Sequence, residues 1–330
     1  MSTVRLSDVI QPVEFSAYVA QNTAVKSALV QSGIMARNNA IEAQLKAGAD
    51  SFTIPAWLDL SDDEASIVSD DPDQLSTPGK VGTTKQRVRK AYLAKSWAAM
   101  NMASELSGSN AMAHIQNRVT AYWERQLQAR LVASLQGIIA DNEASDSSDM
   151  LNDISEEADE AAKLTAEALI DTVGTLGDSM SSVVALCCHS DVFRYLLKLD
   201  AIEYLPPSEG SLSLPTWRGL AVVYDDAMPE EAGVYTTALF GQGAVAYGVT
   251  APRIADGTEV ESLPASGNGG GQQVLHSRQN LAVAPAGFSF DDTATTGDSP
   301  SIAELRDAQS WKRTAEDRRN VPMAFLRHKI

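Results

Sequence analysis

The first residues that could perform chemistry form a glycine motif at Gly241 to Ala246. This segment matches G-x-G-x-x-G/A, and Glu259 and Glu261 follow at about the distance of a ribose-binding acid. Such a fingerprint needs a strand before it and a helix N-terminus after it, because the helix end binds the pyrophosphate. Here β-branched residues, Gly248 and Pro252 follow, which favour strand and turn. The sequence therefore argues against a dinucleotide site.

The histidines and the acidic pairs form no catalytic or metal-binding pattern. None of the histidines has the spacing of zinc ligands or of a catalytic triad, and His189 beside Cys188 is a pair of chain neighbours that rarely converge on one substrate. Asp225-Asp226 and Glu230-Glu231 flank a turn, where we expect solvated side chains rather than a metal site or an acid/base pair. The sequence thus indicates no catalytic residue, no cofactor and no metal.

Composition narrows the class of protein further. The chain has 330 residues and a net charge of −17, which argues against a nucleic-acid-binding surface because such a surface needs clustered lysine and arginine. No apolar run approaches the ~20 residues of a membrane span, and the N-terminus lacks the pattern of a signal peptide. Cys187 and Cys188 should point to opposite faces of a strand, so we expect small buried residues without a disulfide between them.

The element that must organise the chain is a long helix from Asn110 to Asp141. It lacks proline, and good helix formers dominate it. A four-residue apolar step drifts by roughly 40° per step around a helix, so the stripe should wrap the helix and contact more than one layer of protein. The stripe consists of Ile115, Val119, Trp123, Leu127, Leu131 and Leu135. The alternative is an ordinary core helix of an α-rich enzyme.

Two segments precede this helix. Residues from Pro12 to Leu45 are predicted to be helical, with a break at Gly33. From Ala47 to Lys95 an acidic limb returns as a basic limb, which favours a long two-stranded hairpin over the alternative of a solvated loop. Pro55 bars its first strand from the centre of a sheet. The acidic limb holds Asp59, Asp62, Asp63, Glu64, Asp70, Asp71 and Asp73; the basic limb holds Lys80, Lys85, Arg87, Arg89, Lys90 and Lys95.

The rest of the chain alternates helix and strand. The acidic stretch that follows the long helix, near residues 142–162, is expected to be exposed and mobile. A helix from Thr165 to Met180, the strand 181–188, a helix capped by Ser190 or Asp191, and a strand at residues 214–226 follow. Two strands around Gly241 and Gly243 complete an α/β unit that should end near Ala251. Two strand-like limbs joined at 267–271, a short helix after Pro300 and a strand at 320–328 close the chain.

This order of parts resembles the major capsid proteins of tailed bacteriophages, which have the Hong Kong 97 fold. WAAMNMASELSGSNAMAHIQNRVTAYWERQLQARLVASLQG resembles the family's hairpin exit and spine helix, and PTWRGLAVVYDDAMP with GVYTTALFGQGAVAYG resembles the strands of its axial domain. AELRDAQSWKR is similar to its C-terminal helix. The resemblance implies an α+β fold with an N-terminal arm, an E-loop hairpin, a spine helix, and peripheral and axial domains.

The resemblance also implies domain bounds and a function. The expected parts are the N-terminal arm and helix 1–46, the E-loop 47–95, the peripheral domain 96–163 with spine 110–141, the axial domain 164–271, and a return to the peripheral domain at 272–330. The function implied is that of a non-enzymatic subunit. It assembles through hexamers and pentamers into an icosahedral phage head in the bacterial cytoplasm. The head encloses double-stranded DNA without binding a specific sequence, and no membrane is among the implied partners. Implied partners are a portal, a separate scaffolding protein and a decoration protein.

Two alternatives remain, an encapsulin-like compartment that holds enzyme cargo and a soluble α/β enzyme. Within the capsid interpretation, we expect the E-loop to dock on a neighbouring subunit through its divided charges. The candidate interface residues are Asp59, Asp62, Asp63, Asp70, Asp71, Lys80, Lys85, Arg87, Arg89 and Lys90. No local motif assigns Lys80 or Lys85 to a crosslink. We also expect no fused scaffolding segment and no trimming ahead of the E-loop.

Overall fold

The computed structural model describes residues 35–58, 64–68, 70, 73, 75, 78–158, 160–204 and 215–330. Most of the predicted N-terminal helix lies outside these residues. The segment on which the expectation of no trimming rests lies mostly outside them as well. Only the end of that predicted helix is described, as α2 (Asn39–Lys46). The Asn38 side chain caps this helix by accepting a hydrogen bond from the Ala40 amide. Among the described residues, strands form two large sheets and two two-stranded ribbons.

The first sheet, here called the long sheet, is organised around β14 (Gln272–Pro285). Antiparallel β4 (Ala91–Met100) pairs with one edge of β14, and β12 (Val245–Thr250) and β13 (Thr258–Leu263) share the other edge. Short β1 (Met35–Arg37) extends the sheet parallel to β12. The predicted glycine-rich connection between two strand-like limbs is confirmed as the link from β13 to β14. Helix α3 (Asn101–Ser107) then leads from β4 to the spine.

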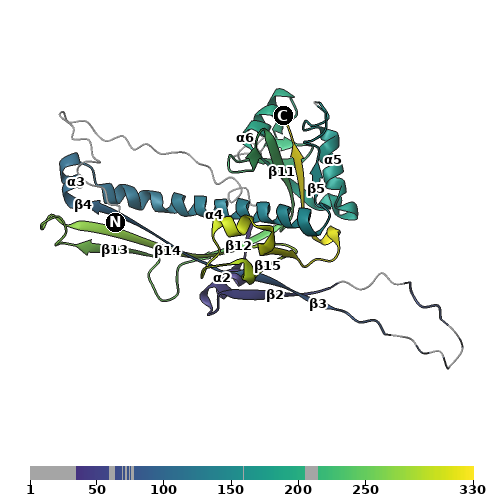
Figure 1. Cartoon of the computed structure of the whole chain (residues 1–330), viewed down its shortest axis with the longest axis horizontal. Helices are drawn as coiled ribbons and strands as arrows, with labels where there is room; N and C mark the ends of the chain where they lie inside the picture. The colour runs from purple at the N-terminus through teal and green to yellow at the C-terminus, as the bar shows by residue number, and fades with distance from the viewer. Residues whose placement is uncertain are drawn as a thin grey trace, which may run out of the picture.

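The second sheet, here called the mixed sheet, collects strands from distant parts of the chain. Its order is β5-β17-β11-β6-β9-β8-β7, with β10 paired to β11. Helices α5 (Ala166–Gly174) and α6 (Ser190–Lys198) belong to the same end of the molecule (Figure 1). The strands are β5 (Leu151–Asp153), β6 (Val183–Cys188), β7 (Glu203–Tyr204), β8 (Pro215–Trp217), β9 (Leu220–Tyr224), β10 (Glu230–Glu231), β11 (Val234–Gly241) and β17 (Met323–His328).

The spine helix α4 (Ala111–Ser145) runs along the long sheet and ends at the mixed sheet (Figure 1). Asn110 caps it, because its side chain accepts a hydrogen bond from the Ala113 amide, and the helix continues four residues beyond the predicted Asp141. The wrapped stripe is confirmed. Trp123 donates to Ser277 of the long sheet (2.8 Å), whereas Gln128 donates to Asp225 beside the mixed sheet. Contact with both sheets explains why a single apolar face would not serve this helix.

Near its C-terminal end the spine crosses the C-terminal segment at Gly137. A Cβ atom there would lie 2.2 Å from the carbonyl oxygen of Leu305 and 2.5 Å from Nε1 of Trp311. Leu305 belongs to α7 (Ile302–Arg306), and η4 (Ala308–Ser310) leads into β16 (Trp311–Arg313), which pairs with β15 (Phe288–Phe290). Ser301 and Glu304 form a capping box that holds the pKa of Glu304 at about 2 through hydrogen bonds from Ser301 and Thr296. The glycine is what allows this close approach.

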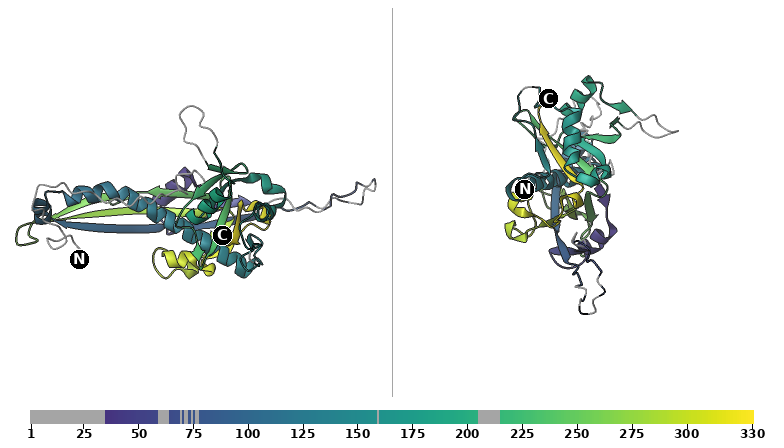
Figure 2. Two further views of the ribbon diagram at one scale, coloured as in Figure 1. Left: turned by 90° about the horizontal axis from the view of Figure 1, so that it is seen from above. Right: turned by 90° about the vertical axis from the view of Figure 1, so that its right-hand side faces the viewer.

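The predicted hairpin is confirmed in β2 (Ser51–Trp57) and β3 (Thr83–Arg89), which pair antiparallel. Its predicted end at Lys95 is wrong, because residues 91–95 belong to β4 of the long sheet. We call these strands and the residues between them the E-loop hairpin. It extends beyond the body of the molecule at the end opposite to the β13–β14 connection (Figures 1 and 2). Pro55 is tolerated because a two-stranded ribbon has no central strand. Buried Val88 and half-buried Phe52 attach its root to Ile41 and Leu45 of α2.

Several local predictions were wrong. The acidic stretch after the spine is not simply exposed, because β5 pairs with β17 and the preceding Met150 is fully buried. The expected strand at residues 214–226 is two strands, since Arg218 and Gly219 both take positive φ in a turn. His189, rather than Ser190 or Asp191, caps α6 by accepting a hydrogen bond from the Asp191 amide.

The predicted α/β unit ending near Ala251 is divided between the two sheets. β11 lies in the mixed sheet, but β12 lies in the long sheet, and the Gly241–Gly243 segment is the crossing between them. C-terminal β17 lies in the mixed sheet beside β11. The cysteine prediction is confirmed: Cys187 and Cys188 are free, fully buried, and belong to the apolar clusters on opposite faces of the mixed sheet. Burial raises the pKa of the Cys188 thiol to about 12.

Candidate assembly surface

The root of the E-loop hairpin is fixed to the chain's own C-terminal segment by one carboxylate. Asp292, in the short helix η3 (Asp292–Ala294), accepts a hydrogen bond from Ser51 Oγ (3.3 Å) and from Arg87 Nη1 (3.0 Å). Arg89 Nη1 lies 3.6 Å from the other carboxylate oxygen, and Arg89 Nη2 donates to the Asp298 carbonyl (3.0 Å). Both hairpin strands therefore converge on Asp292.

Backbone and amide contacts reinforce this root. The Arg87 amide donates to Ser289 Oγ (3.0 Å), and Gln86 Nε2 donates to the Pro285 carbonyl (2.6 Å). Arg87 and Arg89, both candidates for contact with a neighbour, thus have partners within their own chain. A hairpin of two strands is marginal alone, so these contacts are what give it a direction.

Lys90 was expected at a subunit interface but is buried. Only 1% of the residue is exposed, its Nζ donates to the Ala47 carbonyl (2.8 Å), and burial lowers the pKa of the amine. The hydrogen bond ties Lys90 to the connection between α2 and β2 within its own chain. Of the other candidates, Asp70, Lys80 and Lys85 are exposed, whereas Asp59, Asp62, Asp63 and Asp71 lie outside the described residues.

Exposed apolar side chains are the feature of the hairpin that sequence reasoning missed. Ile67 is 90% exposed, Val68 95%, Leu75 87% and Trp57 77%. In the sequence these are apolar residues inside or beside an acidic, turn-rich run. The charge of that run favoured an ionic contact over an apolar one. Large apolar side chains exposed together are typical of a contact surface.

A groove of about 430 Å³ lies beside the hairpin root, between α2, β4 and the segment after β12. Leu45, Tyr92, Leu93 and Ile254 are among its apolar lining, and Ile254 is 91% exposed. Its charged lining residues are Lys46, Arg253 and Arg278, the last paired with Glu259 at 3.1 Å. The groove is thus apolar with a cationic rim.

The groups considered for chemistry do not converge on a catalytic or metal site. Within the described ranges no cluster of three or more His, Cys, Asp or Glu side chains has a metal-binding geometry. Asp225 is buried rather than solvated, because the spine's Gln128 and the Ala227 amide both donate to it. His276 Nδ1 forms a hydrogen bond with Ser96 Oγ on the long sheet (2.8 Å). His328 is buried and belongs to β17 of the mixed sheet. No described helix is long and apolar enough to cross a bilayer.

Comparison with solved structures places this architecture among capsid proteins. The chain resembles the cyanophage Pam1 capsid with a TM-score of 0.62 and 13% identity, covering 97% of each chain. It resembles a protein of Microbacterium phage Oxtober96 with a TM-score of 0.57 and 12% identity, covering 98% and 99%. It also resembles the SrpI encapsulin complex from Synechococcus elongatus, with a TM-score of 0.51 and 11% identity, covering 95% of this chain and 91% of that chain. The fold is therefore the Hong Kong 97 capsid fold.

Sequence comparison gives the family. No family model matches the chain. The major capsid protein of Bacillus phage SPP1, however, is 32% identical over 337 residues, which cover all of this chain and 99% of that protein. The chain accordingly belongs to the family of phage major capsid proteins, the structural subunits of the virion capsid. The predicted class and fold are confirmed.

Proposed function

We propose that copies of this chain form hexamers and pentamers that assemble into an icosahedral head around packaged double-stranded DNA. The observation that carries the proposal is end-to-end similarity to a phage major capsid protein, with a protruding hairpin whose apolar side chains are exposed and covered by none of the described residues. The role is structural rather than catalytic, which the dispersed chemical groups support. A portal, a separate scaffolding protein and a decoration protein are the proposed partners. The net charge of −17 favours enclosing DNA without tight binding.

We assign the sheets to the two domains of the fold. The mixed sheet with α5 and α6 forms the axial domain, and the long sheet with the spine forms the peripheral domain. This assignment moves β5 and β17 into the axial domain and β12 and β13 out of it, relative to the range 164–271. Strands that share hydrogen bonds move as one body, which is why sheet membership is the better criterion.

We infer further that the outer part of the E-loop hairpin docks on a second copy, in the groove beside that copy's hairpin root. Ile67 and Val68 match its apolar floor, and neighbouring acids such as Glu64 and Asp70 match Lys46 and Arg253 on its rim. Exposed Lys80 and Lys85 remain candidates for the same interface. Each exposed ion pair is worth only about 0–1 kcal/mol, so the apolar contact must supply most of the affinity.

Electron microscopy of the purified protein, expressed with and without the phage's scaffolding protein, tests the assembly proposal. The expected result is closed shells tens of nanometres across, with nuclease-protected double-stranded DNA in shells from infected cells. A soluble monomer or small oligomer under both conditions would contradict the capsid proposal. Shells that hold protein cargo and no DNA would favour the encapsulin alternative, for which the similarity to the SrpI complex supports the fold alone.

Paired substitutions test the docking of the hairpin. Ile67→Ser with Val68→Ser on the hairpin, and Ile254→Ser in the groove, should each reduce shell yield while the subunit stays folded. Combining them should be no worse than either alone, because they remove the same contact. Val260→Ser, at an exposed apolar residue of β13, is the matched control. Normal shell yield from the hairpin variant, or additive losses in the combination, would contradict the docking site.

A further inference from the structure

The connection between β13 and β14 contains the chain's one Asn-Gly pair, Asn268-Gly269. It lies at the tip of the long sheet, at the end of the molecule opposite to the E-loop hairpin (Figure 1). In such a pair the main-chain nitrogen of the second residue can attack the side-chain amide of the first, because glycine has no Cβ to obstruct the ring that forms. Asparagine is among the thermolabile residues for this reason. The pair is therefore a candidate for spontaneous chemistry.

The local structure leaves this pair open to reaction. Asn268 is exposed and has a φ of +55°, a region that asparagine tolerates better than most residues. Gly269 has a φ of +90°, and nothing lies within 4 Å of the position that a Cβ would take there. Among the described residues, none forms a hydrogen bond with the Asn268 side chain or with the Gly269 amide. No such contact competes with the attack.

Hydrogen bonds hold the two sides of the connection and leave the pair in solvent. Gly270 donates to the Gly267 carbonyl (3.2 Å), so Asn268 and Gly269 are the two central residues of a turn. The Asn101 amide, at the start of α3, donates to the Gly271 carbonyl (3.1 Å) and fixes the far side. Because both central residues are exposed, a main-chain rotation at Asn268 displaces no buried side chain.

A second pair of similar sequence shows what restrains this chemistry. Asp256-Gly257 is also an acid-glycine pair that can close such a ring. There, Arg278 holds both carbonyls: its Nη1 donates to Asp256 (3.2 Å) and its main-chain amide donates to Gly257 (2.7 Å). A Cβ on Gly257 would lie 3.1 Å from the Cβ of Ala251, so the main chain has little space in which to turn.

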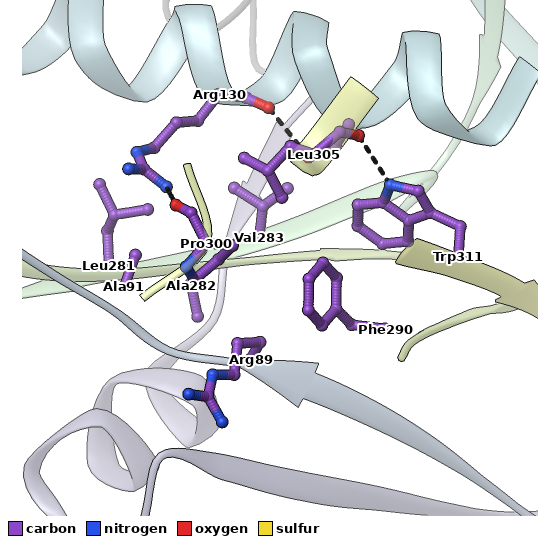
Figure 3. A pocket seen from close by; sticks show the side chains of 11 residues that line it. Arg89, Ala91, Arg130, Leu281, Ala282, Val283, Phe290, Pro300, Leu305 and Trp311 are labelled. Atoms are coloured by element: carbon purple, nitrogen blue, oxygen red, sulfur yellow. Dashed lines mark hydrogen bonds between the residues drawn. The ribbon is translucent and has the colours of Figure 1, made fainter. Parts of the chain in front are cut away.

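The segment before Pro300 is restrained as well. It contains Asp298-Ser299, a pair that can also cyclise. Arg130 of the spine donates to the Pro300 carbonyl (2.8 Å; Figure 3), and Arg89 of the hairpin root donates to the Asp298 carbonyl (3.0 Å). Ring closure there would have to break contacts to two other elements. Of the three pairs, the structure therefore leaves only the one at the tip of the long sheet unrestrained.

We propose that Asn268 is a modification site at which the chain deamidates without an enzyme. The Gly269 main-chain nitrogen loses its proton to solvent and forms a bond to Cγ of Asn268, while the bond from Cγ to the amide nitrogen breaks. That nitrogen takes a proton from solvent and leaves as ammonia, and a succinimide ring remains. Water then opens the ring at either carbonyl and gives aspartate or isoaspartate. The net reaction consumes one water and releases one ammonia, with no change of oxidation state.

The product changes the tip in two ways. Residues 264–272 contain no Asp, Glu, Lys or Arg, so the reaction introduces a negative charge into an uncharged segment. Isoaspartate also adds a methylene to the main chain, inside the turn that Gly267 and Gly270 close and beside the bond from Asn101 to Gly271. Older copies of the subunit should therefore differ from newer ones in charge and in the geometry of this turn.

The test ages the full chain over days in mildly alkaline and mildly acidic buffer. Isoelectric focusing should show a more acidic species that increases with time, and faster in alkaline buffer, because the attacking nitrogen must lose its proton. Mass spectrometry of proteolytic peptides should place the conversion of amide to acid at Asn268, and an isoaspartate-specific methyltransferase should label the same peptide. The internal control is exposed Asn320, which precedes β-branched Val321 and should keep its amide.

Asn268→Gly is the matched variant, because glycine adopts the same positive φ and lacks the reactive amide. It should not form the acidic species. An amide that persists at Asn268 throughout ageing would overturn the proposal, as would an acidic species that forms equally in Asn268→Gly. Conversion of Asn320 at the same rate would show that the local structure does not select the site. If the variant does not fold, the peptide measurement on the unaltered chain decides the matter by itself.

Discussion

At the root of the E-loop hairpin the contacts are mainly hydrogen bonds and ion pairs, whereas at the crossing of α4 with the C-terminal segment they are close and apolar. Three side chains of the hairpin share Asp292, and the outer hairpin leaves Ile67 and Val68 exposed. The crossing instead buries Leu305 and Trp311 against Gly137. The hairpin root therefore has internal partners while the outer hairpin leaves apolar side chains exposed, whereas the crossing buries its own apolar side chains.

This difference predicts two kinds of damage. Substitutions in the body should reduce the stability of the isolated subunit, because each removes buried apolar contact or adds a clash. Substitutions at the hairpin root should leave that stability almost unchanged and reduce assembly, because their contacts are partly exposed and set a direction.

The largest loss should come from shortening the spine's stripe. Leu127→Ala removes a side chain that is 6% exposed and should cost about 2–5 kcal/mol, since the helix and sheet cannot close the space fully. Chemical denaturation of the subunit gives the value. Ile115→Ala, farther along the stripe where the side chain is only partly buried, is the control and should cost less. A loss well under 1 kcal/mol for Leu127→Ala would mean that the stripe does not organise the fold.

Acid should weaken the mixed sheet through His328. This side chain is fully buried, its Nδ1 donates to the Lys329 carbonyl (3.0 Å), its Nε2 accepts from Thr237 (2.8 Å), and burial lowers its pKa from 6.5 to about 4. Between pH 6.5 and about pH 4, the unfolded chain binds a proton at this imidazole and the folded chain does not. Stability therefore falls as pH is lowered from about 6.5 to 4, by about 3 kcal/mol.

Denaturation at several pH values measures this dependence. His328→Gln should flatten that part of the profile, whatever it does to stability at neutral pH. His114→Gln, at an exposed histidine of the spine, should leave the profile as it is. Equal acid sensitivity in the unaltered chain and in His328→Gln would show that other groups are responsible.

A methyl group added at the crossing should cost somewhat less. Gly137→Ala places a Cβ against the Leu305 carbonyl and the Trp311 ring, and overpacking of this kind costs about 1–3 kcal/mol. Gly174→Ala is the matched control, because this helical glycine has open space around its Cβ and alanine is the better helix former. Opposite signs of the two changes are expected in urea denaturation. A neutral or stabilising Gly137→Ala would mean that the crossing can separate without loss.

The sequence predicted the elements whose signal is local. The spine, the strands β6, β11 and β17, and the hairpin followed from apolar periodicity, apolar runs and turn residues in short windows. The stripe's drift also correctly indicated contact with more than one layer. The sequence contains the apolar residues Ile67 and Val68, but it does not show that they are exposed, because exposure depends on the folded chain.

What could not be predicted depends on partners far away in the sequence. The acidic stretch after the spine is drawn into the mixed sheet because β5 pairs with β17, about 170 residues later. Arg87 and Arg89 were predicted to contact a neighbour because a strand's charge pattern does not show that Asp292 will lie beside it. Likewise, nothing near Asp225 indicates that Gln128 will reach it.

The smallest loss of stability, and the sharpest separation of root from body, should come from Asp292→Asn. The amide keeps the shape of the side chain and can still accept from Ser51, but it removes the charge shared by Arg87 and Arg89. The carboxylate is about a quarter exposed, so solvent screens the pairs and the subunit should lose no more than about 1 kcal/mol. Shell yield or uniformity should nevertheless fall clearly, because a ribbon of two strands depends on its root for direction.

Asp298→Asn is the control: it removes the same charge six residues away and keeps the main-chain carbonyl that accepts from Arg89. Denaturation of the subunit and electron microscopy of the assemblies give the two readouts. Normal shells from Asp292→Asn would show that the root tolerates loss of its central charge, and that the apolar cluster around Val88 is sufficient to aim the hairpin.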